Sequence, residues 1–248
     1  MARGDMLFGV QAYWSLDEAS GNRADSVGSN TLTDHNTVTS GTGLFGNAAL
    51  FTAANSEYLT AADAAGLRIN GDFSVSLWLK PASLANGFIS ILDKRATGAA
   101  GWNFAYTHNT AFPAAENTFF GFGGQNSSGG NASAGAVGPL AVGTWTHVVG
   151  LYEASQPAFR VIVNGVDDQN GSPFANTGGV DPSGGTETLY VGCYSDLSYF
   201  FDGYIDQVII WNRLITAQDA TDLYNGGAGL PYPFYNGPQT FRRTGGLR

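Results

Sequence analysis

The residue best placed to do chemistry in this sequence is Asp206, a carboxylate inside an apolar strand pattern. Strict alternation through residues 204–211 puts two sets of side chains on opposite faces: Ile205, Gln207, Ile209 and Trp211 on one, and Tyr204, Asp206, Val208 and Ile210 on the other. Because a carboxylate among apolar side chains is costly unless it is paired, backbone amides, an arginine or a bound cation should lie beside it. Asp206 is therefore predicted to be part of a site or a structural anchor.

Cysteine and histidine offer less chemistry. Cys193 is the only cysteine, so neither an intramolecular disulfide nor a cysteine-based zinc site can form, and a small buried side chain is favoured over a nucleophile. His147 lies in an apolar strand pattern, which favours a buried, hydrogen-bonded histidine. His35 and His108 have no second histidine or acidic residue at metal-site spacing.

Composition predicts one all-β domain. The chain has 248 residues, with 35 glycines, 32 aromatic residues as 16 Phe, 11 Tyr and 5 Trp, and only 12% charged residues. Such a composition is typical of many aromatic strands joined by small-residue turns, and the length is within reach of one large sandwich. The net charge of -9 argues against nucleic acid and against a polyanionic partner, because phosphate recognition needs clustered Lys and Arg.

Eleven short runs read as strands, which suggests two packed sheets. They are 12–16, 48–51, 57–60, 73–81, 89–94, 102–107, 118–122, 145–152, 159–163, 188–193 and 203–211. The longest connections, residues 123–138 and 170–185, are polar and glycine-rich, and are either functional loops or low-complexity spacers. A capping box from Thr216 to Asp219, with Asn225 and Gly226 as a stop, predicts a short helix between them.

The two ends of the chain read differently from its middle. The first residues contain no apolar run long enough for a signal peptide, which favours a protein that is not exported by the usual signal, and no segment is long enough to span a bilayer. Residues 230–248 are punctuated by proline and glycine and carry three arginines, Arg242, Arg243 and Arg248. We expect an N-terminal arm over 1–7, one domain over 8–229, and a tail or docking arm over 230–248.

Several short segments, taken in order, resemble the laminin-G-like jelly rolls of the concanavalin A-like lectin and glucanase superfamily. The resemblance covers roughly residues 8–225 and rests on segments at 13–18, 48–51, 57–59, 72–80, 145–149, 163–165, 190–192, 201–208 and 211–213. It implies a two-sheet antiparallel jelly-roll sandwich with a short C-terminal helix and an extended C-terminal tail. It also implies binding of glycans or proteins far more often than catalysis.

In related jelly rolls the aspartate of the final strand commonly anchors a structural calcium ion with groups near the first strand. The resemblance places these ligands at Asp206, with Asp17, Glu18 or Asp25 as partners, and calcium prefers such oxygen ligands. The alternative is that Asp206 accepts hydrogen bonds from backbone amides or from Arg213. Trp78, Trp145 and Trp211 are expected in the core. We expect an exposed ligand-binding platform to consist of Trp102, Tyr106, Phe119 and Phe120.

Three functions follow as hypotheses. The first is a non-catalytic virion component, such as a bacteriophage capsid decoration or tail protein, assembled in the host cytoplasm. Its C-terminal arm would order on neighbouring subunits, in a homo-oligomer or a larger assembly. The second is an extracellular or cell-surface lectin that binds cell-surface glycans, either with calcium or without it. The third, a glucanase-like hydrolase, is the weakest, because no glutamate begins the Glu-x-Asp-x-x-Glu pattern of the superfamily's glucanases.

Overall fold

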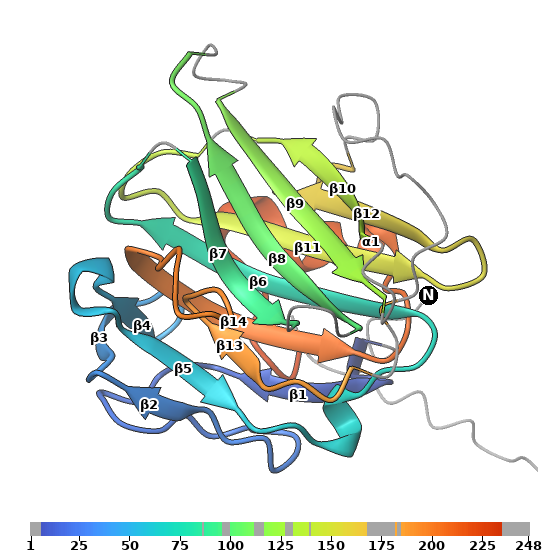
Figure 1. Ribbon diagram of the computed structural model, residues 1–248, viewed down its shortest axis with the longest axis horizontal. Helices are drawn as coiled ribbons and strands as arrows, with labels where there is room; N and C mark the ends of the chain where they lie inside the picture. The colour runs from blue at the N-terminus through green and yellow to red at the C-terminus, as the bar shows by residue number, and fades with distance from the viewer. Residues whose placement is uncertain are drawn as a thin grey trace, which may run out of the picture.

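The protein is a sandwich of two antiparallel sheets, with a short helix packed on the outer side of one of them (Figure 1). This computed structural model describes residues 6–85, 87–95, 100–111, 117–126, 131–138, 140–167, 182 and 185–234. The all-β, two-sheet prediction is confirmed. No helix within these ranges is long and apolar enough to cross a membrane.

We call the sheet nearer the viewer in Figure 1 the front sheet and the other the back sheet. The front sheet has the order β10 (Asn131–Val137), β9 (Thr118–Gln125), β8 (Gly101–His108), β7 (Gly87–Lys94), β13 (Leu189–Val191), β5 (Tyr58–Ala61) and β2 (Thr33–His35). The back sheet has the order β12 (Ala158–Val163), β11 (Thr146–Glu153), β6 (Phe73–Pro81), β14 (Gly203–Trp211), β4 (Asn47–Phe51) and β3 (Thr39–Thr42), and β1 (Val10–Trp14) also pairs with β14.

A large apolar core fills the space between the sheets. Trp14, Val75 and Leu77 from the back sheet belong to the same cluster as Phe104 and Phe122 from the front sheet, and all five are buried. Apolar side chains alternate along these strands because one face of each sheet points inward. The predicted helix is also present as α1 (Ala217–Tyr224), with the capping box between Thr216 and Asp219 and a left-handed Asn225 at its end.

A β-bulge in β14 changes the predicted faces of that strand. Gln207 has a positive φ of 52°, and the register with β6 shifts between Asp206 and Ile209. As a result Ile205 and Val208 both point into the core between the sheets, whereas Ile209 points to the outer side. The expectation that Asp206 shares a face with Val208 and Ile210 is therefore wrong, because strict alternation fails where one extra residue is inserted.

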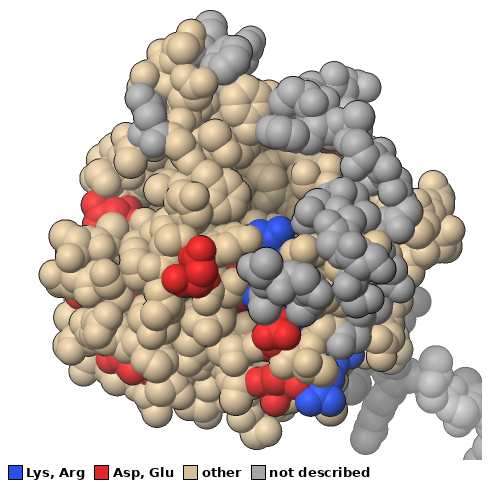
Figure 2. All heavy atoms as spheres, viewed as in Figure 1, with Lys and Arg blue, Asp and Glu red and all other residues tan. Residues whose placement is uncertain are grey.

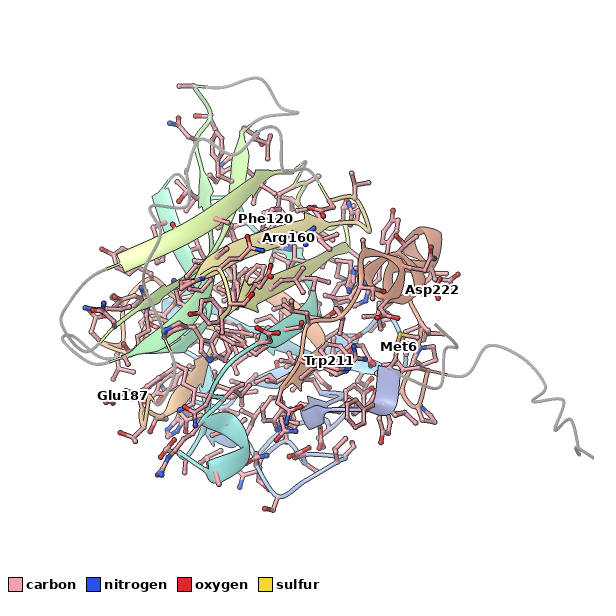
Figure 3. All side chains as sticks on the ribbon, turned by 90° about the vertical axis from the view of Figure 1, so that its right-hand side faces the viewer. Met6, Phe120, Arg160, Glu187, Trp211 and Asp222 are labelled. Carbon is pink, nitrogen blue, oxygen red and sulfur yellow. The ribbon has the colours of Figure 1, made fainter. Side chains whose placement is uncertain are left out.

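A second apolar cluster covers the outer side of the back sheet. Trp211 is fully buried there, and its Nε1 donates to the carbonyl of Met6 over 2.8 Å. Figure 3 shows the two side by side, on the side of the molecule that carries α1. Leu230 and Phe234 join the same cluster. Among the described residues, this packing thus includes Met6, Leu230 and Phe234, which lie outside the predicted limits of 8 and 229.

Other differences from the sequence prediction lie in weakly patterned segments. The predicted loop 123–138 contains the end of β9 and the whole of β10, because small residues pair as a hairpin edge without any apolar alternation. The short strands β2 and β3 were not predicted either. Most of the predicted loop 170–185 lies outside the described residues, as do Arg242, Arg243 and Arg248. The docking arm, the assembly it would serve and the virion location stay predictions.

Candidate functional site

Asp206 is held by the turn between β3 and β4. Its side chain is fully buried, and Oδ2 accepts a hydrogen bond from the Leu44 amide over 2.7 Å, while Gln207 Nε2 donates to Oδ1 over 3.2 Å. Burial raises the pKa of this carboxyl to about 7, although the amides of Leu44 and Phe45 act to lower it. Asp206 therefore anchors a hairpin turn, in agreement with the amide-bonded alternative.

Asp17 approaches the same turn through its far end. Its Oδ1 accepts from the amide of Asn47 over 2.9 Å, and a Cβ built on Gly46 would lie 2.3 Å from that oxygen. A Cβ on Gly43 would lie 2.8 Å from Oδ2 of Asp206. The same Cβ on Gly43 would lie 2.3 Å from the Asn47 carbonyl oxygen, so glycine is required there mainly by the Asn47 backbone and at Gly46 by the Asp17 carboxylate. The first strand's loop and the last strand clasp one hairpin.

The other two predicted calcium ligands bond to their own loop. Glu18 Oε1 accepts from the Ala24 amide over 2.7 Å. Asp25 accepts from the amides of Tyr13, Val27 and Asn30 at 3.0 to 3.1 Å. Burial alone would raise the pKa of Asp25, but these backbone donors outweigh it and hold the pKa below its ordinary value. Both carboxylates therefore stabilise the loop after β1 through hydrogen bonds to its backbone.

The four predicted ligands do not form one cluster. Asp17 and Asp206 flank the turn, whereas Glu18 and Asp25 are engaged within the loop that follows β1. Across the described part of the chain, no group of three His, Cys, Asp or Glu side chains lies close enough to hold a metal ion. A calcium site stays a prediction of the resemblance.

The aromatic platform is wrong for three of its four residues. Trp102, Tyr106 and Phe120 are at most 4% exposed and belong to the core between the sheets. Their strands alternate so that these rings point inward, and the labelled Phe120 lies in the interior in Figure 3. Phe119 points the other way and is half-buried. Trp78 and Trp211 are buried as predicted, but neither belongs to the cluster between the sheets. Trp211 lies in the outer cluster, Trp78 packs on His147 and Tyr224, and Trp145 is half-buried.

The two residues expected to be structural are buried. His147 Nε2 lies 2.8 Å from Ser76 Oγ, beneath the rings of Trp78 and Tyr224, and burial lowers its pKa to about 3. Cys193 is fully buried, which raises the pKa of its thiol to about 12. At neutral pH the histidine is therefore uncharged, and the thiol is protonated and not activated for nucleophilic attack.

The outer face of the front sheet has a different character. Pairing places Ala105, Gly121 and Gly135 opposite one another on β8, β9 and β10, and the next row holds Asn103, Gly123 and Ser133. We call these six residues the floor. They alternate with the inward rings of Trp102, Phe104, Phe120 and Phe122, so they must face outward. Figure 2 looks onto this face, which is hollowed near its middle and carries few charged side chains.

The floor is open above Gly121, whereas Ala105, Gly123 and Gly135 are buried. A Cβ added to Gly121 would meet no atom within 4 Å, and both Gly121 and Ser133 are half-buried. The floor spans three strands, about 10 Å across at the usual strand spacing. Small side chains expose polar backbone and allow a flat molecule to approach it closely. Asn103, which is 8% exposed, adds an amide with both donors and an acceptor.

A buried ion pair borders the floor on β7. Asp93 lies opposite Asn103 and is fully buried, and its Oδ1 accepts from Arg95 Nε over 3.2 Å. Burial raises the pKa of Asp93, although Arg95 and the Ser195 amide, 3.2 Å from Oδ2, act to lower it. A buried pair of this kind is weak evidence for stability, and polar groups of this kind are typical of binding sites.

This face was not predicted, although the sequence contains a signal for it. In residues 118–125 (TFFGFGGQ), Phe120 and Phe122 alternate with Gly121 and Gly123. A period of two, with aromatic rings on one face and glycines on the other, indicates a strand from whose outer face no side chains project. The glycines read as a loop because the same residue type is also common in turns.

The fold is shared with known proteins. Residues 53–221 match the profile of the concanavalin A-like lectin/glucanases superfamily. Domain 4 of AbnA, an extracellular GH43 arabinanase from Geobacillus stearothermophilus solved with arabinotriose, aligns with a TM-score of 0.61 and 21% identity over 86% of this chain and 97% of that domain. A comparison with curated protein sequences finds no match.

Toxin binding domains share the fold as well. The binding domain of Paraclostridial Mosquitocidal Protein 1 aligns with a TM-score of 0.65 and 11% identity, over 91% of this chain and 53% of that one. The botulinum neurotoxin serotype D binding domain gives 0.63 and 14%, over 88% and 52%. This chain thus corresponds to about half of each toxin domain. It belongs to the concanavalin A-like lectin/glucanases superfamily, as its profile match covers more than half its length.

Proposed function

We propose that this protein is a non-catalytic carbohydrate-binding protein that holds an oligosaccharide on the floor. The observation that carries the proposal is the row of small residues on β8 to β10, with Asn103 set among them and open space above Gly121. A sugar chain presents hydroxyl groups, which suit the Asn103 amide and the Arg95 guanidinium, which is partly exposed and held by the buried Asp93. The arabinotriose complex of the AbnA domain, which has the same fold, supports this choice of ligand.

Filling the space above the floor tests the proposal. The Gly121→Trp variant should lose glycan binding by about a hundredfold or more, because its ring would occupy the place of the ligand. Its melting temperature should not fall, since a Cβ at this position meets nothing within 4 Å and aromatic residues suit strands. Binding would be measured on an array of neutral and uronate-containing oligosaccharides, arabinotriose included, and then by calorimetry with the best neutral glycan.

The matched control is Thr39→Trp, which adds the same ring at an exposed position of β3 on the back sheet. This control should bind like the wild type. A second variant, Asn103→Ala, should weaken binding because it removes a side chain that can both donate and accept hydrogen bonds. Unchanged glycan affinity in a folded Gly121→Trp protein would place the ligand elsewhere and overturn the proposal.

A further inference from the structure

A cluster of three aromatic side chains lies beside the floor, next to β7. It consists of Phe88, Tyr194 and Tyr199, whose ring centroids lie 5.3 to 6.2 Å apart in edge-to-face contact. Arg95 packs on this cluster, with its guanidinium carbon 5.3 Å from the centre of the Tyr194 ring. We call these four side chains the wall. Edge-to-face packing and the cation over a ring fix the wall in one arrangement.

The loop after β13 positions the wall against the floor. Its two ends bond to β7: the Gly192 amide donates to Ile91 over 2.8 Å, and Ser90 donates to the carbonyl of Tyr199 over 3.1 Å. The Ser195 amide bonds to Asp93, which lies directly opposite Asn103 in the floor. The wall therefore follows the edge of the floor and is tied to the same buried ion pair.

The wall is not arranged for stability alone. Tyr199 is 53% exposed and Leu197 is 48% exposed, although both are large apolar side chains. Both also adopt the left-handed backbone, with φ of 52° and 61°, which is unfavourable for residues other than glycine. At the foot of the wall, Ser90 Oγ is buried without a hydrogen-bond partner among the described residues. Backbone strain, exposed aromatic rings and an unpaired buried hydroxyl each reduce stability. Such features are typical of functional sites.

From these contacts we infer that the wall is the stacking surface of the glycan site and that the ligand is an uncharged glycan. Tyr199 is the residue that packs against a sugar ring. The inference rests on the proposed function and deepens it. A half-exposed ring beside a polar floor matches a sugar, which has an apolar C–H face and a rim of hydroxyls.

Charge favours a neutral ligand. The wall and floor contribute one arginine, and Asp93 already pairs with it over 3.2 Å. The whole chain carries a formal net charge of -9, which repels polyanions such as uronate polymers. Binding should therefore depend on stacking and hydrogen bonds, and it should change little between low and high salt.

The test compares variants of Tyr199 in the full chain. Tyr199→Asn removes the ring with a residue that tolerates the left-handed backbone, so the loop should keep its shape. Tyr199→Trp retains an aromatic surface, and Phe8→Ala removes a 75% exposed ring far from the floor in sequence and on the β1 side. With the best neutral glycan from the array as probe, Tyr199→Asn should bind about tenfold more weakly. The other two variants should bind like the wild type.

The outcomes separate this inference from the function on which it rests. If Gly121→Trp abolishes glycan binding and Tyr199→Asn leaves it intact, the ligand lies on the floor but does not stack on the wall. A folded wild-type protein that binds no glycan on the array would overturn both, as would a protein partner whose binding survives both substitutions. A preference for uronate-containing glycans, lost at high salt, would overturn the neutral ligand alone.

Discussion

The Asp206→Asn variant should lose a pH dependence of stability worth about 4 kcal/mol, the free energy of a pKa shift of about three units. In the folded protein burial raises the pKa of Asp206 to about 7, from an ordinary value of 3.8. Between about pH 4 and pH 7 the folded state thus holds a proton that the unfolded state has released. Stability from this group falls as the pH rises through that window. Urea unfolding of both proteins at a series of pH values would measure the difference.

Asp25→Asn provides the comparison with opposite sign. Backbone amides hold the pKa of Asp25 below its ordinary value, so its stabilising effect is present above that value and is lost only in stronger acid. Its replacement should lower stability at neutral pH and leave the slope between about pH 4 and pH 7 in place. A wild-type slope that persists in Asp206→Asn would contradict the assigned role.

Calcium gives this experiment a second use. If calcium binds beside Asp17 and Asp206 at the turn between β3 and β4, it will keep Asp206 ionised and raise the stability of the wild type. The change of the unfolding free energy with pH will then be smaller. If Asp206 only anchors the turn at Leu44, added calcium will change neither quantity. The same titrations with calcium and with a chelator therefore decide between the two interpretations left open by the sequence.

The Trp211→Ala variant should be destabilised by about 3 to 5 kcal/mol, the usual cost of removing a fully buried tryptophan. The loss includes its packing against Phe234, whose ring centroid lies 6.4 Å away, and leaves the Met6 carbonyl without its donor. Because the side chain joins the two ends of the described chain on the back sheet, its removal should loosen both. Urea denaturation of the purified variants measures the cost.

Trp211→Phe separates packing from the hydrogen bond. The smaller ring retains most of the apolar contact and cannot donate to Met6, so it should cost clearly less than alanine, about 1 to 2 kcal/mol. A loss below about 1 kcal/mol for Trp211→Ala would mean that the outer cluster does not unfold with the sandwich. The cluster of Met6, Leu230 and Phe234 would then be a separate appendage.

The sequence predicted the sandwich well because apolar alternation determines strands whose inner face is buried. Strands such as β6 and β11 carry apolar residues at regular intervals and are buried along nearly their whole length, and the capping box at Thr216 marks the start of α1. Alternation could not reveal the bulge at Gln207, since an inserted residue depends on the pairing partner and not on composition. It therefore assigned Val208 to the wrong face.

The candidate site was harder to predict, for two physical reasons. Its floor consists of small residues such as Gly121 and Ser133, whose meaning depends on which side of a strand is already buried. Its wall combines Phe88 on β7 with Tyr194 and Tyr199, more than a hundred residues later in the chain. Exposed aromatic residues were expected at Trp102 and Tyr106 because loops and strand ends could not be separated by pattern alone.

An NMR titration would show directly whether a glycan occupies the outer face of the front sheet. Amide signals of the wild-type protein would be followed as the best neutral oligosaccharide from the array is added. If the glycan binds there, the largest chemical-shift changes should occur at the amides of Asn103, Gly121 and Ser133 and in the loop around Tyr199. The amides of β11, β12 and α1 should change little. Shifts centred on the back sheet, with the floor unmoved, would contradict this placement of the glycan.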